Sequence, residues 1–126
     1  MMATRAPQHQ RSDAEVLSAA LVRIADYWGL SNAKLGAVLG LSPATASRLK
    51  SGKSLLDPAS KSFEAGQFLL RLFRSLDAVM GSDDDASRRW LATANLDLAA
   101  RPLDLIDSFR GLITVCDYVD TYRARV

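Results

Sequence analysis

Aspartates are the side chains whose spacing could most readily support chemistry in this chain of 126 residues. Asp83, Asp84 and Asp85 are consecutive, and carboxylate oxygens are the preferred ligands of Ca²⁺ and Mg²⁺. Consecutive side chains cannot all face one ion, however, and no ligand loop of fixed pattern surrounds them. At the start of a helix the same charges interact favourably with the helix dipole. We therefore predict helix capping here rather than a metal site.

Catalysis by paired carboxylates or by an activated nucleophile is the second alternative. Four more aspartates recur at helical spacing, which is typical of the solvated face of an amphipathic helix: Asp104, Asp107, Asp117 and Asp120. The one histidine, His9, lies in a polar stretch, so a serine or cysteine nucleophile has no credible base. Cys116 lies among apolar residues and fits a small core position. We predict no enzymatic activity, no bound metal and no cofactor.

Charge is distributed unevenly along the chain. Residues 1–56 contain seven basic and three acidic residues, a net charge of +4, whereas residues 57–126 have a net charge of −2. A basic N-terminal half suits a polyanion such as DNA, and an acidic C-terminal half suits a protein partner. We find no signal peptide and no membrane-spanning apolar run, and a single cysteine cannot form an internal disulfide. A cytoplasmic protein without membrane association is expected.

Apolar residues recur with helical periodicity, and glycine and proline lie almost only between the periodic stretches, so the sequence predicts an all-α fold. The first helix is expected to begin at Ser12 or Asp13, to bury Val16, and to end at Gly29. Two short helices follow, separated by Gly40. The expected segments are a flexible tail over residues 1–11, a helix-turn-helix region over 12–56, a long connecting helix over 57–81 and a small helical domain over 82–126.

The long helix is expected to be the structural centre of the chain, and Asp57 with Pro58 is expected to open it. Its apolar residues form one broad stripe that is typical of a core helix. Beyond it, Pro102 is expected to open a further short helix, and Gly111 is expected to permit a bend before the last helix.

Residues 30–52, LSNAKLGAVLGLSPATASRLKSG, have the layout of a helix-turn-helix. Gly36 is small enough to let the two helices approach. Arg48 is the strongest candidate for reading bases, because a guanidinium can contact guanine with two hydrogen bonds, whereas Ala44 can only touch a thymine methyl. The predicted DNA contacts combine this outer face with helix ends that hold phosphates: Ser31, Asn32, Ser42, Pro43, Ala44, Ser47, Arg48, Lys50 and Lys53. The alternative is a helical hairpin retained only for packing or dimer contacts.

A second pattern lies in the C-terminal part of the chain. Trp90, Asn95, Pro102 and Gly111 follow one another, with apolar and acidic residues around the proline and an amphipathic segment after the last glycine. Together with the helix-turn-helix, this pattern resembles the Xre/MbcA/ParS-type antitoxins of bacterial toxin–antitoxin pairs. The resemblance covers nearly everything after the N-terminal tail.

The resemblance implies a toxin-binding domain in which Trp90, Asn95, Pro102 and Gly111 are scaffold positions. It also implies a cognate toxin, usually of the RES-domain kind that is similar to NAD-degrading ADP-ribosyl enzymes. The antitoxin would block the active site of that toxin and repress its own operon. The residues implied at the toxin are Tyr118, Tyr122, Arg123, Arg125 and Val126.

A homodimer on operator DNA is expected, because a helix-turn-helix this small rarely binds tightly as a monomer. Higher assemblies with the toxin would follow. The alternative is a stand-alone transcriptional regulator whose C-terminal helices serve dimerisation or bind a ligand.

Overall fold

The all-α prediction is confirmed by a computed structural model, in which residues 11–124 are described. The first three helices in these residues are α1 (Asp13–Trp28), α2 (Asn32–Leu39) and α3 (Pro43–Lys50). Each begins at a serine whose side chain accepts a hydrogen bond from a backbone amide of the first turn: Ser12, Ser31 and Ser42. Such caps satisfy amides that the helix itself leaves without partners. Helices α1 and α2 end at Gly29 and Gly40. Both glycines have a positive φ, the left-handed conformation with which helices commonly end and which glycine adopts without steric cost.

The close approach of α2 and α3 depends on Gly36. A Cβ atom added there would lie 2.5 Å from the carbonyl oxygen of Leu41, in the turn between the two helices. Ala46 and Leu49 of α3 are buried against the core, and Leu41 packs at its edge. The helix-turn-helix geometry inferred from the sequence is therefore present, with the small residue in the position that the packing requires.

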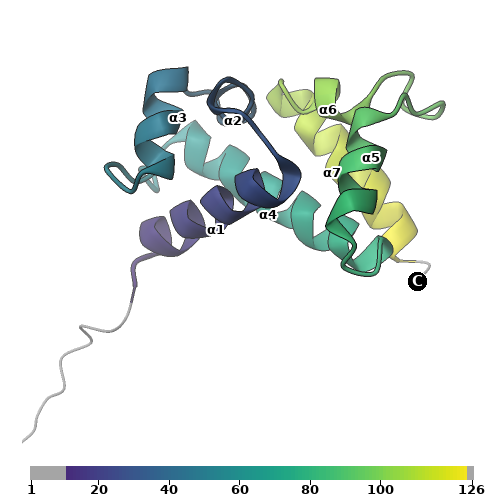
Figure 1. Cartoon of the computed structure of the whole chain (residues 1–126), viewed down its shortest axis with the longest axis horizontal. Coiled ribbons are helices and arrows are strands. Elements are labelled where there is room, and N and C mark those ends of the chain that lie inside the picture. The colour runs from purple at the N-terminus through teal and green to yellow at the C-terminus, as the bar shows by residue number, and fades with distance from the viewer. Residues whose placement is uncertain (1–10, 125–126) are drawn as a thin grey trace, which may run out of the picture.

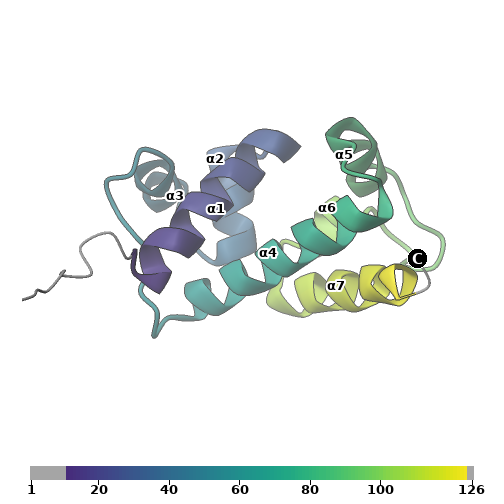
Figure 2. The ribbon, with the colours of Figure 1, turned by 90° about the horizontal axis from the view of Figure 1, so that it is seen from below.

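The central element is α4 (Lys61–Val79), which runs diagonally across the molecule between the N-terminal and the C-terminal helices (Figure 1). It packs against α1 and α2, and α7 (Phe109–Arg123) lies along it in the same direction, as the second view shows (Figure 2). Leu69, Leu72 and Leu76 are at most 1% exposed. One continuous hydrophobic core thus joins the N-terminal helices to the C-terminal ones.

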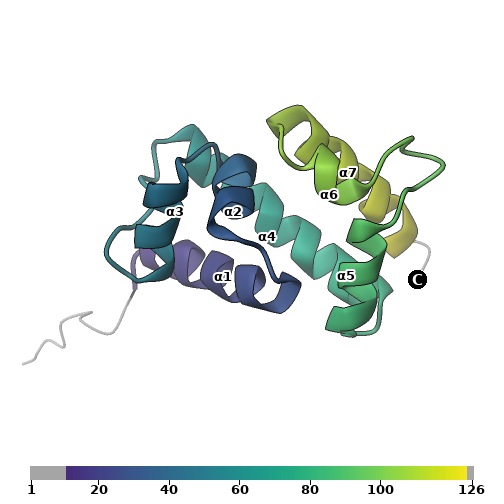
Figure 3. The ribbon, with the colours of Figure 1, turned by 45° about the horizontal axis from the view of Figure 1, so that its top comes forward.

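The C-terminal part is completed by α5 (Asp84–Ala92) and the short α6 (Pro102–Leu105), which pack together beside α7 (Figure 3). Asp83 caps α5 by accepting a hydrogen bond from the amide of Ala86 at 3.0 Å, and this confirms the capping prediction for the acidic run. Within residues 11–124, no helix combines the length and the apolar character needed to cross a membrane.

Three local expectations are wrong. The long helix begins at Lys61 rather than at Asp57, because the Asp57 carboxylate accepts a hydrogen bond from Ala59 N in a turn and Ser60 then caps the helix. Val16 is 52% exposed, since it lies beside rather than within the buried stripe of α1. Gly111 makes no bend; it lies inside α7, where a Cβ atom would collide with the carbonyl oxygen of Leu105.

Candidate DNA-binding and partner-binding surfaces

The outer face of α3 carries four exposed residues that the sequence places in a DNA groove: Pro43, Ala44, Ser47 and Arg48. One guanidinium nitrogen of Arg48 donates a hydrogen bond to Thr45 Oγ1 at 2.9 Å. This contact orients the side chain along the helix. A guanidinium has five N–H donors, so the other N–H groups of Arg48 remain available to contact a base. This outer face of α3 therefore consists of short or polar side chains that are accessible to solvent.

The helix ends beside α3 differ in how accessible their side chains are. Ser31, Asn32 and Ser42 are exposed at the N-termini of α2 and α3, where amides and the helix dipole favour a phosphate. Lys53 is also exposed. Lys50 is half-buried, and its ammonium donates to the carbonyl oxygen of Leu30 at 2.8 Å. Lys50, the last residue of α3, therefore supports the turn after α1.

Tyr118 is the centre of an aromatic cluster in the C-terminal part. Its ring is stacked on Trp90, with ring centroids 6.3 Å apart, and lies edge-on to Tyr122 at 5.1 Å. Its hydroxyl lies 3.2 Å from that of Tyr122 and donates to a carboxylate oxygen of Asp97 at 2.7 Å. Hydrogen bonds with Tyr122 and then with Asp97 raise the pKa of Tyr118 to about 12. The phenol is therefore neutral and fixed in place at physiological pH.

A shallow apolar hollow of about 160 Å³ lies beside this cluster. It is lined by residues from α4, α5 and α7: Leu76, Val79, Met80, Trp90, Tyr118, Val119 and Tyr122. Two of the residues assigned to toxin contact, Tyr118 and Tyr122, thus meet one of the scaffold residues, Trp90. A hollow of this size accommodates about one aromatic or branched side chain.

The other predicted scaffold residues hold the connection between α5 and α7. Asn95 closes the loop over residues 93–100 with two hydrogen bonds: its amide donates to Ala100 O at 3.0 Å, and its side-chain oxygen accepts from Leu98 N at 3.1 Å. Pro102 is buried at the first position of α6. Gly111 allows the turn after α6 to contact α7. These residues shape the backbone and do not form a reactive centre.

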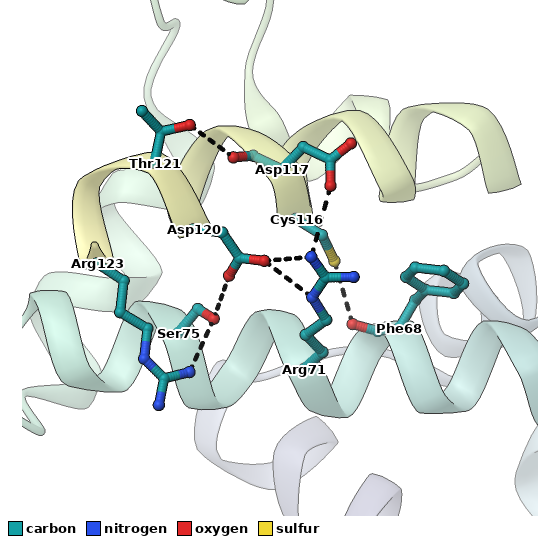
Figure 4. A network of polar contacts seen from close by, with 8 residues as sticks. All are labelled: Phe68, Arg71, Ser75, Cys116, Asp117, Asp120, Thr121 and Arg123. Carbon is teal, nitrogen blue, oxygen red and sulfur yellow. Dashed lines mark hydrogen bonds and ion pairs between the residues drawn. The ribbon is translucent and has the colours of Figure 1, made fainter.

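A polar network between α4 and α7 lies on another side of α7 (Figure 4). The Asp120 carboxylate accepts hydrogen bonds from Arg71 Nε at 2.9 Å, from a second nitrogen of Arg71, and from the buried Ser75 hydroxyl at 2.5 Å. Arg123 donates to the same hydroxyl at 3.2 Å, and Asp117 pairs with Arg71 at 3.6 Å. Two of the aspartates expected on a merely solvated face therefore bind α7 to α4.

The charge state of Asp120 follows from this network. Partial burial raises the pKa of its carboxyl, but hydrogen bonds from Ser75 and Arg71, together with the charges of Arg71 and Arg123, outweigh burial and lower the pKa below its ordinary value. Sequence reasoning missed this group. A usable signal exists, because Arg71 and Ser75, like Cys116 and Asp120, are four residues apart and so share one helix face.

Reactive groups are scarce in the part of the chain that the structure describes. Cys116 is fully buried, and burial raises the pKa of its thiol to about 12. Residues 11–124 contain no cluster of three or more His, Cys, Asp or Glu side chains that could hold a metal ion. Arg123 is exposed at the end of α7, whereas Arg125, Val126 and His9 lie outside the described residues.

Comparison with protein families agrees with this division into two surfaces. Residues 7–74 match the model of the antitoxin Xre-like helix-turn-helix domain, and residues 75–125 match that of the antitoxin Xre/MbcA/ParS C-terminal toxin-binding domain. A search of curated proteins found no match. The matched regions meet within α4, and they confirm the resemblance seen in the sequence. The chain belongs to the antitoxins with an Xre-like helix-turn-helix domain and carries an Xre/MbcA/ParS C-terminal toxin-binding domain.

Proposed function

We propose that this antitoxin neutralises a RES-type, NAD-degrading toxin through its C-terminal domain and represses its own operon by binding DNA through α3. The observation that carries the proposal is the pairing, in one chain, of an antitoxin helix-turn-helix with a toxin-binding domain.

For DNA, we assign base reading to Ala44, Ser47 and Arg48 on the exposed face of α3. Phosphate contact is assigned to the ends of the helices and the turn that follows α3: Ser31, Asn32, Ser42, Lys50 and Lys53. Pro43 has no N–H to donate and is assigned apolar contact in the groove. A dimer would place two copies of α3 in successive major grooves, which is how helix-turn-helix proteins reach useful affinity.

For the toxin, we assign contact to the end of α7 and the residues that follow it: Tyr118, Tyr122, Arg123, Arg125 and Val126. The guanidinium groups of Arg123 and Arg125 can each pair with a carboxylate of the toxin through two hydrogen bonds.

Toxin neutralisation is tested by co-expression with the toxin gene that should lie beside this one. Full-length antitoxin should restore growth and cellular NAD, whereas a variant without residues 122–126 should not. A variant without residues 2–10 is the matched truncation at the other end and should protect like the full chain. Protection by both truncated variants would contradict the tail assignment, and the absence of a toxic neighbour would favour the stand-alone regulator.

DNA binding is tested with the promoter of the same operon. Arg48→Ala should cost about 1–3 kcal/mol on the operator and little on random DNA, because it removes one base contact. Lys53→Ala should weaken both DNAs alike and flatten the salt dependence, because it removes a phosphate contact. Equal losses on both DNAs for Arg48→Ala would reject its role in base reading.

A further inference from the structure

Leu96 is the most exposed large apolar side chain in the part of the chain that the structure describes. It is 98% exposed, whereas the next, Leu55 and Val16, are 53% and 52% exposed. An exposed leucine by itself is common on protein surfaces and requires no explanation. The significance of Leu96 depends on how the loop around it is held.

The residues on both sides of Leu96 are fixed. The amide of Asn95 is bonded to Ala100 O, and the amide of Leu98 is bonded to the side chain of Asn95. Asp97 accepts the hydroxyl hydrogen of Tyr118 at 2.7 Å, and the Leu98 side chain packs against the core. The loop therefore cannot fold inward to bury Leu96 without breaking these contacts.

An apolar side chain on a loop whose backbone is held in place is suited to binding a partner. Association normally costs free energy because loops and side chains lose conformational freedom at the interface. Here hydrogen bonds already order the backbone of residues 95–100 in the free protein. The loop therefore loses little conformational freedom when it binds. A few anchor side chains that enter pockets on the partner commonly supply most of the affinity of an interface, and such an anchor can be aliphatic.

The charge around Leu96 indicates the chemistry of the partner. Residues 93–107 contain three aspartates and one arginine. Arg101 is paired with Asp104, and Asp107 is paired with Lys34, at 2.8 Å in each case. Asp97, next to Leu96, is hydrogen-bonded to a neutral phenol. The loop therefore presents an apolar side chain beside a negative charge, and a partner with basic groups around an apolar pocket complements it.

A second copy of the chain fits this surface less well. A two-fold contact through the loop would bring two copies of Asp97 toward each other, and like charges at an interface are unfavourable.

We propose that Leu96 is the anchor by which the C-terminal domain docks onto its toxin, entering an apolar pocket whose rim is basic. This inference rests on the proposed function, in that it presupposes a toxin partner. It adds a contact residue outside the end of α7, and it gives the loop over residues 93–100 a role in binding rather than only in connecting helices.

The test uses the full antitoxin and the toxin encoded beside it, with affinity measured by titration calorimetry on an inactive toxin variant. Leu96→Ala should weaken binding at least tenfold, and Leu96→Asp about a hundredfold, because a carboxylate in an apolar pocket is strongly disfavoured. Leu55→Asp, at an exposed leucine in the helix-turn-helix region, is the matched control and should bind like wild type. All three variants should melt like wild type, because these side chains are exposed.

A second variant tests the charge. Asp97→Asn keeps an oxygen that can accept the Tyr118 hydrogen bond but removes the negative charge. It should slow association several-fold and reduce its dependence on salt, because electrostatic steering acts mainly on the association rate.

The outcomes separate this inference from the proposed function. If wild type binds and Leu96→Asp binds equally well, the anchor role is overturned while the antitoxin function stands. If Leu96→Asp abolishes self-association and leaves toxin affinity unchanged, the occupant is a second copy and the proposal is wrong. If wild type itself fails to bind or protect against the toxin, the proposed function is overturned, and this inference with it.

Discussion

Lys34 of α2 and Asp107, before α7, form an ion pair with 2.8 Å between Nζ and Oδ1. The same ammonium donates a hydrogen bond to the carbonyl oxygen of Leu103 at 3.0 Å. Lys34 is a residue of the helix-turn-helix, and its partners belong to the toxin-binding domain. These two contacts attach α2 of the helix-turn-helix to α6 and to the segment before α7, and neither contact involves α4.

Replacing Lys34 by methionine should loosen this attachment. The ion pair is partly exposed, so its own contribution is below 1 kcal/mol, and the hydrogen bond to Leu103 adds a similar amount. We expect a loss of about 1 kcal/mol in the free energy of unfolding, measured by urea denaturation. Lys61→Met, at the exposed start of α4, is the control. A double-mutant cycle with Asp107→Asn that shows no coupling would contradict the assignment.

Gly111→Ala should destabilise the fold although it lies in a helix. At an open helical position the same change stabilises by about 0.5–1 kcal/mol. Here the new Cβ atom would collide with Leu105 O, so the turn after α6 must shift. We expect a loss of about 1–3 kcal/mol, as for other overpacked sites. Thr114→Ala, at an exposed position of α7, should change the thermal midpoint little; equal midpoints for both variants would refute the packing argument.

Acidification should weaken the contact between α4 and α7 through Asp120. Its pKa is lowered in the folded chain, so its carboxylate stabilises the fold above the ordinary carboxyl value of about 4. This contribution is lost as the pH falls from that value through the lowered one, because protonation removes an acceptor and a charge. Asp120→Asn should therefore be less stable than wild type at pH 7, and the difference should shrink below pH 4. A difference that stays constant with pH would reject the mechanism.

Cys116 should be inert toward thiol reagents in the folded protein. It is fully buried, its thiol donates to Phe68 O at 3.2 Å, and burial raises its pKa to about 12. At pH 8 the reactive thiolate is essentially absent. Labelling with a disulfide reagent should therefore follow the rate of unfolding and accelerate in urea. Rapid stoichiometric labelling of native protein would show that the site is open.

Local signals in the sequence were sufficient for most helix boundaries. Ser12, Ser42 and Asp83 precede helices because each offers a side-chain oxygen to an amide of the first turn, and this depends only on neighbouring residues. The same kind of reasoning failed at Asp57. Its carboxylate bonds to Ala59 within a turn, and no periodicity distinguishes a turn of this kind from the first turn of a helix.

The site was less predictable, because its contacts join residues far apart in the chain. Trp90 and Tyr118 were each named from a family pattern, but their stacking and the hydroxyl bond to Asp97 depend on how α5 packs on α7. The pairs Arg71–Asp120 and Lys34–Asp107 likewise depend on the alignment of separate helices. The exposure of Leu96 could not be anticipated, since its type alone suggested burial.

The two matched regions meet inside one uninterrupted helix, and this has a geometric consequence. Along α4 each residue advances about 1.5 Å and turns the helix by about 100°. Adding a single residue near Ser75 would turn Leu76, Val79 and Met80 by that angle relative to Phe68 and Arg71, although α7 contacts α4 on both sides of the insertion. The contacts of α7 therefore fix the number of residues in α4 between the two matched regions, and an insertion there should destabilise the fold.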